Sequence, residues 1–426
     1  MIETIKSMIK NSLHISILIT FFFFLAPFNK SYASKTTWQI QSIDTMKTSR
    51  DLTLYKQNDA SFDREIHKEL SSIKAMGANY VTIDGAYDTS YIPWMKRWVN
   101  SARKKGLHIW FRGNFSGWHG WFGPKDMTRE EHIQALKSFI ISNADLFQDG
   151  DSFTACPECE YGGAGNPLDT KDFKGFRKFM LDEYEVMNDS FSKIHKKVYT
   201  NWFSMNPDIA NEILDTETVN KIGNIITLDY YVKDPQELDK GINFFLNKFP
   251  NAKILIGEFG APLPAINGTM TEKEQAQFIE KILMHLYNYK DKIIGINYWV
   301  SYYGDTSLLH SDYTPKTAFS TVKSYFIPAI IKGTVVNQLG EILTDVKIET
   351  SNGFLSTKTD KDGRYLLTVV SHEANITAGN NEYITTSAEI KNLTSGSETI
   401  QNFTLIPIHQ NLLYRIRMFL YSIGKK

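Results

Sequence analysis

The sequence has little cysteine and no excess of charge of either sign. Two of its 426 residues are cysteines, which excludes a fold held by a disulfide framework and a zinc site with four cysteine ligands. The 47 basic residues balance 47 acidic ones, and this zero net charge argues against a dedicated nucleic-acid-binding protein. The sequence also lacks a P-loop, a dinucleotide-binding fingerprint, HExxH and GxSxG. Several common nucleotide-, metal- and serine-dependent enzyme classes are thereby disfavoured.

The chain does have the length and the apolar residues of a folded, multidomain protein. Hydrophobic residues make up 42% and charged residues 22%, a balance that allows packed cores and is unlike that of a disordered chain. The length suggests two or three domains.

The first 33 residues are typical of an export signal. Lys6 and Lys10 precede an apolar run over residues 13–28, and Ser31-Tyr32-Ala33 matches a small-x-small cleavage site before Ser34. The alternative is an uncleaved membrane anchor, because the run approaches the ~18 residues of a spanning helix. Either interpretation predicts that the remaining chain is secreted or extracytoplasmic, or is associated with a membrane.

Residues 34–328 are predicted to form a (β/α)8 barrel. Eight short β-rich runs alternate with amphipathic helical stretches, and this alternation implies parallel strands with crossover helices. The runs are residues 38–43, 80–83, 108–111, 152–156, 198–202, 225–231, 254–259 and 294–300. Thr128 and Thr271 are expected to begin helices, and Gly77 and Gly106 to end them. A doubly wound open sheet is the alternative, but residues 44–48 carry no glycine-rich phosphate loop after the first run.

The sequence changes character after Pro328. Residues 329–407 alternate in β fashion with turn signals and predict a small all-β sandwich. Residues 408–426 form a basic tail in which apolar residues recur at helical spacing and the charged residues are all Lys or Arg. The tail is expected either to lie on a membrane surface or to pack as a helix or remain disordered.

Carboxylates follow two of the predicted barrel strands. Glu158 and Glu160 come after the fourth run, and Glu258 ends the seventh. The carboxyl ends of barrel strands build the active site in this fold. Two carboxyls across a barrel mouth are what retaining glycoside hydrolysis needs, one as nucleophile and one as acid and then base.

These residues resemble those of the clan A glycoside hydrolases, the (β/α)8 superfamily with cellulase-like, mannanase-like and family 5-like enzymes. The resemblance covers roughly residues 38–326 and is strongest at Ile256-Gly257-Glu258-Phe259-Gly260, which looks like the nucleophile strand. It implies that Glu258 is the nucleophile and Glu158 the acid/base. The family usually has Asn before the acid/base, whereas this chain has Pro157, and Glu160 therefore stays a rival for the acid role.

The resemblance also implies substrate-binding aromatic residues. Tyr230 or Tyr231 matches a family Tyr on strand six, and Trp299 matches a Trp on strand eight. Trp118 and Trp121 lie in a glycine-rich segment that suits stacking on a sugar ring, with packing of the loop as the alternative.

Two polar residues near the third run are further candidates. Arg112 is positioned to pair with a catalytic carboxylate or to form a structural salt bridge. Asn114 is placed either to bond a sugar hydroxyl or to close its loop.

Cys156 and Cys159 bracket Glu158 in a C-x-x-C spacing. A redox role requires a strand–helix context of the thioredoxin type, and a metal site requires two more ligands. A local disulfide and two free thiols both remain open.

Residues 333–336, 340–343, 346–348 and 359–365 resemble carboxypeptidase-regulatory-like, transthyretin-like sandwiches, which implies a non-catalytic accessory domain. Together the sequence predicts an exported, monomeric, retaining β-glycoside hydrolase that acts on an oligo- or polysaccharide without a metal or organic cofactor. The alternative is a catalytically inactive (β/α)8 carbohydrate-binding protein.

Overall fold

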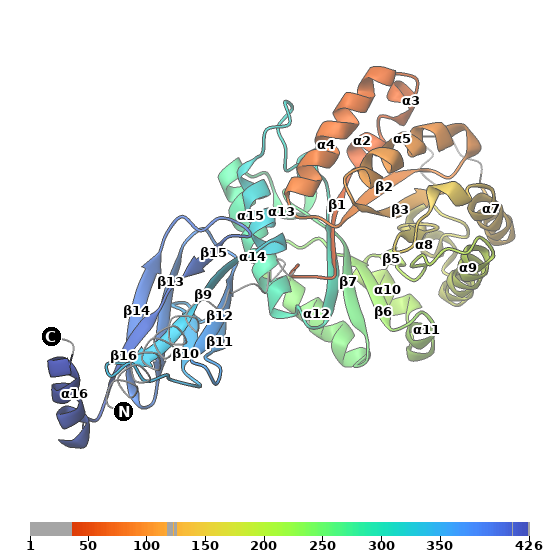
Figure 1. Cartoon of the computed structure of the whole chain (residues 1–426). Helices are drawn as coiled ribbons and strands as arrows, with labels where there is room; N and C mark the ends of the chain where they lie inside the picture. The colour runs from red at the N-terminus through yellow and green to blue at the C-terminus, as the bar shows by residue number, and fades with distance from the viewer. Residues whose placement is uncertain (1–35, 117–121, 123–125, 411, 425–426) are drawn as a thin grey trace, which may run out of the picture. The chain divides into compact units, whose positions relative to one another are not determined.

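The computed structural model describes residues 36–116, 122, 126–410 and 412–424. Residues Thr36–Lys426 belong to one compact unit, in which a parallel barrel with surrounding helices is followed in sequence by a second, mostly antiparallel sheet (Figure 1). The predicted (β/α)8 fold followed by a β-rich region is therefore confirmed.

The barrel contains eight parallel strands in the order β4-β3-β2-β1-β8-β7-β6-β5. The strands are β1 (Ile40–Asp44), β2 (Tyr80–Ala86), β3 (His108–Asn114), β4 (Ser152–Thr154), β5 (Ser204–Met205), β6 (Ile225–Asp229), β7 (Lys253–Phe259) and β8 (Ile293–Tyr298). Hydrogen bonds close the ring between β4 and the segment before β5, where Phe153 N donates to Tyr199 O and Tyr199 N donates to Asp151 O.

Helices follow or connect the barrel strands, as crossover connections require. They are α2 (Met46–Ser49), α3 (Thr53–Lys56), α4 (Asp63–Ala75), α5 (Ile92–Arg103), α7 (Arg129–Ser142), α8 (Pro167–Thr170), α9 (Phe173–Lys193), α10 (Pro207–Ile213), α11 (Thr216–Lys221), α12 (Gln236–Lys248), α13 (Pro264–Asn267), α14 (Glu272–Asn288) and α15 (Thr317–Phe326).

Capping residues are found at the helix starts and ends that the sequence predicts. Thr128 and Thr271 each form a capping box at the start of α7 and α14, in which the side chain accepts from the N3 backbone amide. Gly77 and Gly106 follow α4 and α5 with φ of 95° and 66°, a left-handed conformation that glycine adopts without steric cost.

The fifth strand lies elsewhere than the sequence predicts. Residues 198–202 were expected to form it, but the strand comprises Ser204 and Met205, and the predicted run contributes an isolated bridge between Tyr199 and Ser152. Trp202 is fully buried, and Tyr199 stacks on it. The apolar residues of this segment are thus explained by packing inside the barrel, at the end where the strands begin. A hydrophobic run alone does not show at which residue the hydrogen-bonded strand starts.

Side chains inside the barrel lie in layers that position the polar residues. Large apolar residues fill the end where the strands begin, and they comprise Ile40, Tyr80, Trp110, Trp202 and Leu255. Two residues further along the strands, Ser42, Thr82 and Asn297 are joined by hydrogen bonds. Because successive inward positions along a strand are two residues apart, the next layer comes at the carboxyl ends.

The second sheet follows α15 and has the order β11-β10-β13-β14-β16-β9-β12, with β15 paired to β9. Its strands are β9 (Ala329–Asn337), β10 (Lys347–Thr350), β11 (Ser356–Lys358), β12 (Arg364–Val369), β13 (Ala374–Asn380), β14 (Tyr383–Ile390), β15 (Glu398–Ile400) and β16 (Phe403–Pro407). Buried residues alternate with more exposed ones along β10 and β12, so one face of these strands packs against a core.

The predicted tail is a helix, α16 (Leu412–Gly424), and most of its apolar side chains are exposed. Over the part of the chain that the structure describes, no helix combines the length and apolarity needed to cross a bilayer.

Candidate active site

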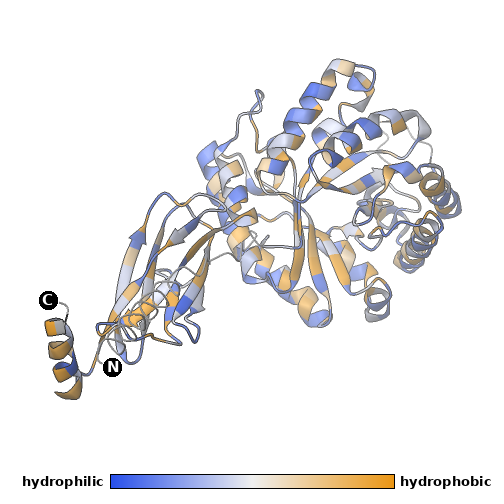
Figure 2. Cartoon of the chain, in the orientation of Figure 1, coloured by the Kyte–Doolittle hydropathy of each residue, from blue (hydrophilic) through white to orange (hydrophobic). Residues whose placement is uncertain are grey.

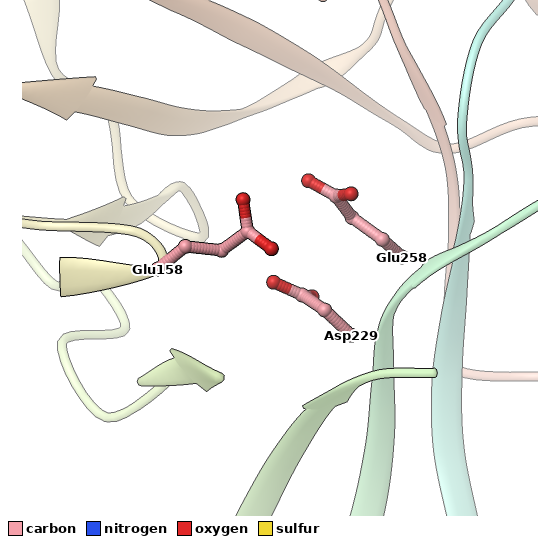
Figure 3. Close-up of side chains that lie close together, drawn as sticks. All are labelled: Glu158, Asp229 and Glu258. Atoms are coloured by element: carbon pink, nitrogen blue, oxygen red, sulfur yellow. The ribbon is translucent and has the colours of Figure 1, made fainter. Parts of the chain in front are cut away.

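The carboxyl ends of the barrel strands carry a layer of buried polar and charged side chains. The layer consists of Asp44 on β1, Asp84 on β2, Arg112 on β3, Ser204 on β5, Asp229 on β6 and Glu258 on β7. Glu158 joins it from the turn after β4 (Figure 3). This is the end of the fold where (β/α)8 enzymes place their catalytic groups.

Arg112 lies at the centre of this layer and is fully buried. Its guanidinium forms an ion pair with Glu258 and others with Asp44 at 3.4 Å and Asp229 at 3.2 Å. It also donates to Ser204 Oγ at 3.0 Å. A fixed, always charged cation among several carboxylates offsets part of the cost of burying their negative charge.

Glu258 points into the barrel because of an irregularity in β7. Leu255 belongs to the interior cluster, so strict alternation would place residues 257 and 259 inward and Glu258 outward. The register of β7 shifts against both β6 and β8 next to this position, which is how a bulge re-aims a side chain. Gly257 is required there, because a Cβ atom would lie 2.4 Å from Asp229 Oδ1.

The carboxylate of Glu258 is held from two sides. Arg112 binds Oε1, and the Tyr231 hydroxyl donates to Oε2 at 2.6 Å. Burial and the neighbouring charge of Glu258 raise the pKa of the Tyr231 hydroxyl well above its usual value, so this group stays a donor.

Glu158 faces Glu258 across the barrel mouth. One carboxylate oxygen of each, together with one of Asp229, lies within 4.8 Å of the others (Figure 3). Burial, followed by the charge of Glu258, raises the pKa of Glu158 to about 8. The Asn206 side-chain amide donates to Glu158 at 3.3 Å. Glu158 is therefore protonated near neutral pH and close to a second carboxylate.

Glu160 has a different environment from Glu158. It is almost fully buried, and the backbone amide of Asn206 donates to it at 3.1 Å. Burial raises its pKa to about 7. Glu160 is not among the three carboxylates that meet within 4.8 Å. The geometry therefore brings Glu158, rather than its rival, to Glu258.

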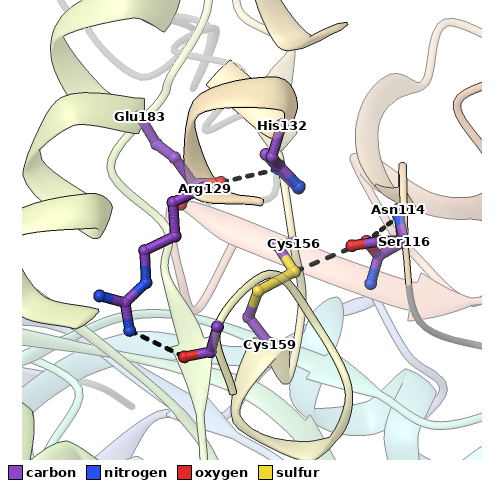
Figure 4. Close-up of a disulfide and its surroundings, with 8 residues drawn as sticks. Asn114, Ser116, Arg129, His132, Cys156, Cys159 and Glu183 are labelled. Carbon is purple, nitrogen blue, oxygen red and sulfur yellow. Dashed lines mark hydrogen bonds and ion pairs between the residues drawn. A yellow bond between two sulfur atoms is a disulfide. The ribbon is translucent and has the colours of Figure 1, made fainter. Parts of the chain in front are cut away.

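A disulfide joins Cys156 and Cys159 around Glu158 (Figure 4). Of the two states that the sequence left open, the structure has the disulfide. Glu158 lies inside the loop with φ of 47°, a left-handed conformation that is uncommon for residues with a side chain. Gly163 packs so closely on both sulfur atoms that a Cβ atom there would lie 2.0 Å from Cys159 Sγ. The bridge thus restrains the turn that presents Glu158.

The other predicted residues divide between the site and its surroundings. Tyr231 reaches Glu258, whereas the Tyr230 hydroxyl turns away and donates to the Glu237 carbonyl at 3.0 Å. Trp299 lies beside Tyr231, with ring centroids 6.1 Å apart in an edge-on arrangement. Among Tyr230, Tyr231 and Trp299, only the last two are therefore near the carboxylates.

Asn114 lies next to the disulfide. Its side-chain oxygen accepts from Ser116 N at 3.1 Å and contacts Cys156 Sγ at 3.6 Å (Figure 4). These contacts match the loop-closing alternative for this residue. Trp118 and Trp121 lie outside the described residues.

Sequence reasoning did not select Asp44, Asp84, Asp229 or Asn206. Asp44, Asp84 and Asp229 share a signal that was available, a polar residue at or near the carboxyl end of a predicted strand. Asn206 precedes α10 and had no such signal, because the position of β5 was not predicted correctly. Burial raises the pKa of Asp44 to about 6 and those of Asp84 and Asp229 well above their usual range.

Comparison with known proteins identifies relatives only at the level of fold. No family model matches the sequence, and no curated protein matches it. Among solved structures, the catalytic domain of a family 53 glycoside hydrolase from Ignisphaera aggregans has a TM-score of 0.51 at 14% identity, over 68% of this chain and 96% of that one. A family 5 xyloglucanase from Paenibacillus pabuli has a TM-score of 0.50 at 13% identity, over 68% and 98%.

A longer match comes from a larger enzyme. The β-glucuronidase of Bacteroides uniformis aligns with 80% of this chain at 13% identity and a TM-score of 0.45. This chain spans only 44% of that enzyme's length. The two solved structures with a TM-score of at least 0.50 are glycoside hydrolases, and at 13–14% identity they establish only that this chain has a (β/α)8 barrel fold.

Proposed function

We propose that the protein is a retaining β-glycoside hydrolase. The observation that carries the proposal is the pairing of Glu158, with its raised pKa, and Glu258 across the barrel mouth, where one carboxylate oxygen of each lies within 4.8 Å of the other. Retaining enzymes separate their two carboxyls by about 5–5.5 Å, whereas inverting enzymes leave about 6.5–9.5 Å for a water molecule.

The reaction follows from the two environments. Glu258, oriented by Arg112 and Tyr231, attacks the anomeric carbon while the glycosidic C–O bond breaks. Glu158 gives its proton to the departing oxygen. In the second step Glu158, now ionised, takes a proton from water, whose oxygen displaces Glu258 from the anomeric carbon.

The substrate and the setting of the enzyme belong to the same proposal. The substrate is a β-linked oligo- or polysaccharide, which the Trp299 ring contacts beside Tyr231. The chain acts as an exported monomer without a metal or organic cofactor, and residues 329–407 serve as a non-catalytic accessory domain of the carboxypeptidase-regulatory type. The support for export is the signal-like pattern of residues 1–33.

Hydrolysis of a panel of glucans, mannans, xylans and galactans tests this function. Wild type is expected to release sugar whose anomeric configuration, followed by NMR during the first turnovers, equals that of the substrate. Glu258→Gln keeps the side-chain shape but removes the nucleophile, and we expect it to lose at least ~10⁴-fold in rate. Inversion of configuration, or equal rates for the two proteins, contradicts the proposal.

An inactive carbohydrate-binding barrel is the second candidate. Pro157 stands where the resembling family has an Asn that helps to bind the sugar, and this departure favours the candidate. Isothermal titration with the same glycans separates the two. Saturable binding by wild type without hydrolysis of any glycan, including activated aryl glycosides, supports the binding protein.

A further inference from the structure

The C-terminal helix α16 leaves its apolar side exposed among the described residues. Five residues that share one face of the helix by their spacing are all exposed, and they are Leu412, Ile416, Phe419, Leu420 and Ile423. Leu412 is 75% and Phe419 64% exposed. Figure 2 shows the helix as mostly hydrophobic in colour.

The contacts of α16 with the β region come from side chains outside the apolar face. The Tyr414 hydroxyl donates to Gln338 at 3.4 Å, and Arg417 forms an ion pair with Glu341. Surface helices normally bury their apolar stripe against the protein and expose polar residues. The orientation of α16 is the reverse, so none of the residues that the structure describes buries its apolar face.

Charge indicates what covers this face. Residues 408–426 contain Arg415, Arg417, Lys425 and Lys426 and no acidic residue. Arg415 comes four residues before Phe419, and Arg417 four after Leu413, so the two arginines border the apolar face on opposite sides. An arginine stem in this position lies along an apolar phase while its charged group reaches a polar, anionic boundary. Because Arg417 forms an ion pair with Glu341, Arg415 is the arginine best placed to do so.

We propose that α16 lies flat in the interface of a membrane that contains anionic lipids. The helix has 13 residues and at about 1.5 Å per residue is shorter than the ~30 Å hydrocarbon core, so it is suited to the interface and not to crossing. A second copy of the chain is a poorer partner, because two such helices packed face to face bring like charges together.

Vesicle flotation tests the proposal on residues 34–426, which retain the whole compact unit and lack the predicted export signal. The vesicles are phosphatidylcholine alone, or phosphatidylcholine with one quarter phosphatidylglycerol. We expect wild type to float with the anionic vesicles and Ile416→Ser/Phe419→Ser to bind them at least ~100-fold more weakly, since each lost apolar side chain costs about tenfold. Arg415→Gln is expected to bind about fivefold more weakly at low salt.

The matched control is Ile384→Ser/Ile400→Ser, which removes two isoleucines that are also exposed but lie on β14 and β15. We expect it to bind like wild type. Equal binding by wild type and the α16 double variant overturns the proposal. The proposal is also overturned if wild type binds neither kind of vesicle and sedimentation shows a dimer that the α16 substitutions dissociate. Because the substituted side chains are exposed, unfolding curves should coincide.

Discussion

The assignment of the acid/base makes a quantitative prediction for the pH dependence of hydrolysis. Glu158 must be protonated in the free enzyme, and its pKa is raised to about 8. About 90% of it is then protonated at pH 7, and kcat/KM should fall about tenfold for each pH unit above 8. Glu160, whose pKa is about 7, would place this limb one unit lower if it were the acid.

Two matched amide substitutions separate the carboxyls. Glu158→Gln removes the proton donor, so the basic limb should disappear. We expect kcat/KM to fall about 10²–10⁴-fold for natural glycans and far less for dinitrophenyl glycosides, whose leaving group needs no proton. Glu160→Gln should keep the limb and move it below 8, because the negative charge of Glu160 contributes to the raised pKa of Glu158.

The assay is initial-rate kinetics on one natural glycan and one dinitrophenyl glycoside across a pH series. Azide added to Glu158→Ala should restore turnover of the activated substrate, since azide needs no general base to attack the anomeric carbon and displace Glu258, which releases a glycosyl azide. If Glu160→Gln abolishes the basic limb while Glu158→Gln leaves it in place, the reasoning from geometry and burial is refuted.

Three other changes have defined outcomes. Burial raises the pKa of Glu69 to about 8 from 4.5, so this residue alone should lower the free energy of unfolding by about 1.4 kcal/mol per pH unit between those values. In urea unfolding, Glu69→Gln should reduce the pH slope by that amount and leave the slope due to the other buried carboxyls, and parallel pH profiles of the two proteins would contradict this. Tyr231→Phe should lower kcat/KM about 10–100-fold, with Tyr230→Phe as the unaffected control. Cys156→Ser/Cys159→Ser should lower the free energy of unfolding by about 2 kcal/mol at most, because the loop that the disulfide closes is short. The same variant should lower kcat at least ~10-fold, because the bridge restrains the turn that presents Glu158. An unchanged kcat would show that the bridge does not position the acid.

Much of the barrel could be predicted from local patterns. The capping boxes at Thr128 and Thr271 and the left-handed glycines after α4 and α5 are local, so neighbouring residues suffice to specify them. The strand that contains Glu258 was also predictable from a local pattern, because a strand that is buried on both faces is a continuous apolar run. The position predicted for the fifth strand was wrong, because the pairing of β5 with β6 and the burial of Trp202 are not visible in the local pattern.

The sequence by itself determined the alternation of strands and helices, the basic tail with apolar residues at helical spacing, and the carboxylates at the carboxyl ends of the fourth and seventh strands. These follow from periodicity and from residue type at a strand end. Only the tertiary structure decided that Arg112 joins Glu258, Asp44 and Asp229, that Tyr231 and not Tyr230 reaches the nucleophile, and that Glu158 is closer to it than Glu160. Each of these contacts depends on a register shift, on a turn or on burial between residues that are distant in the sequence. The local pattern of residue types does not specify such long-range contacts.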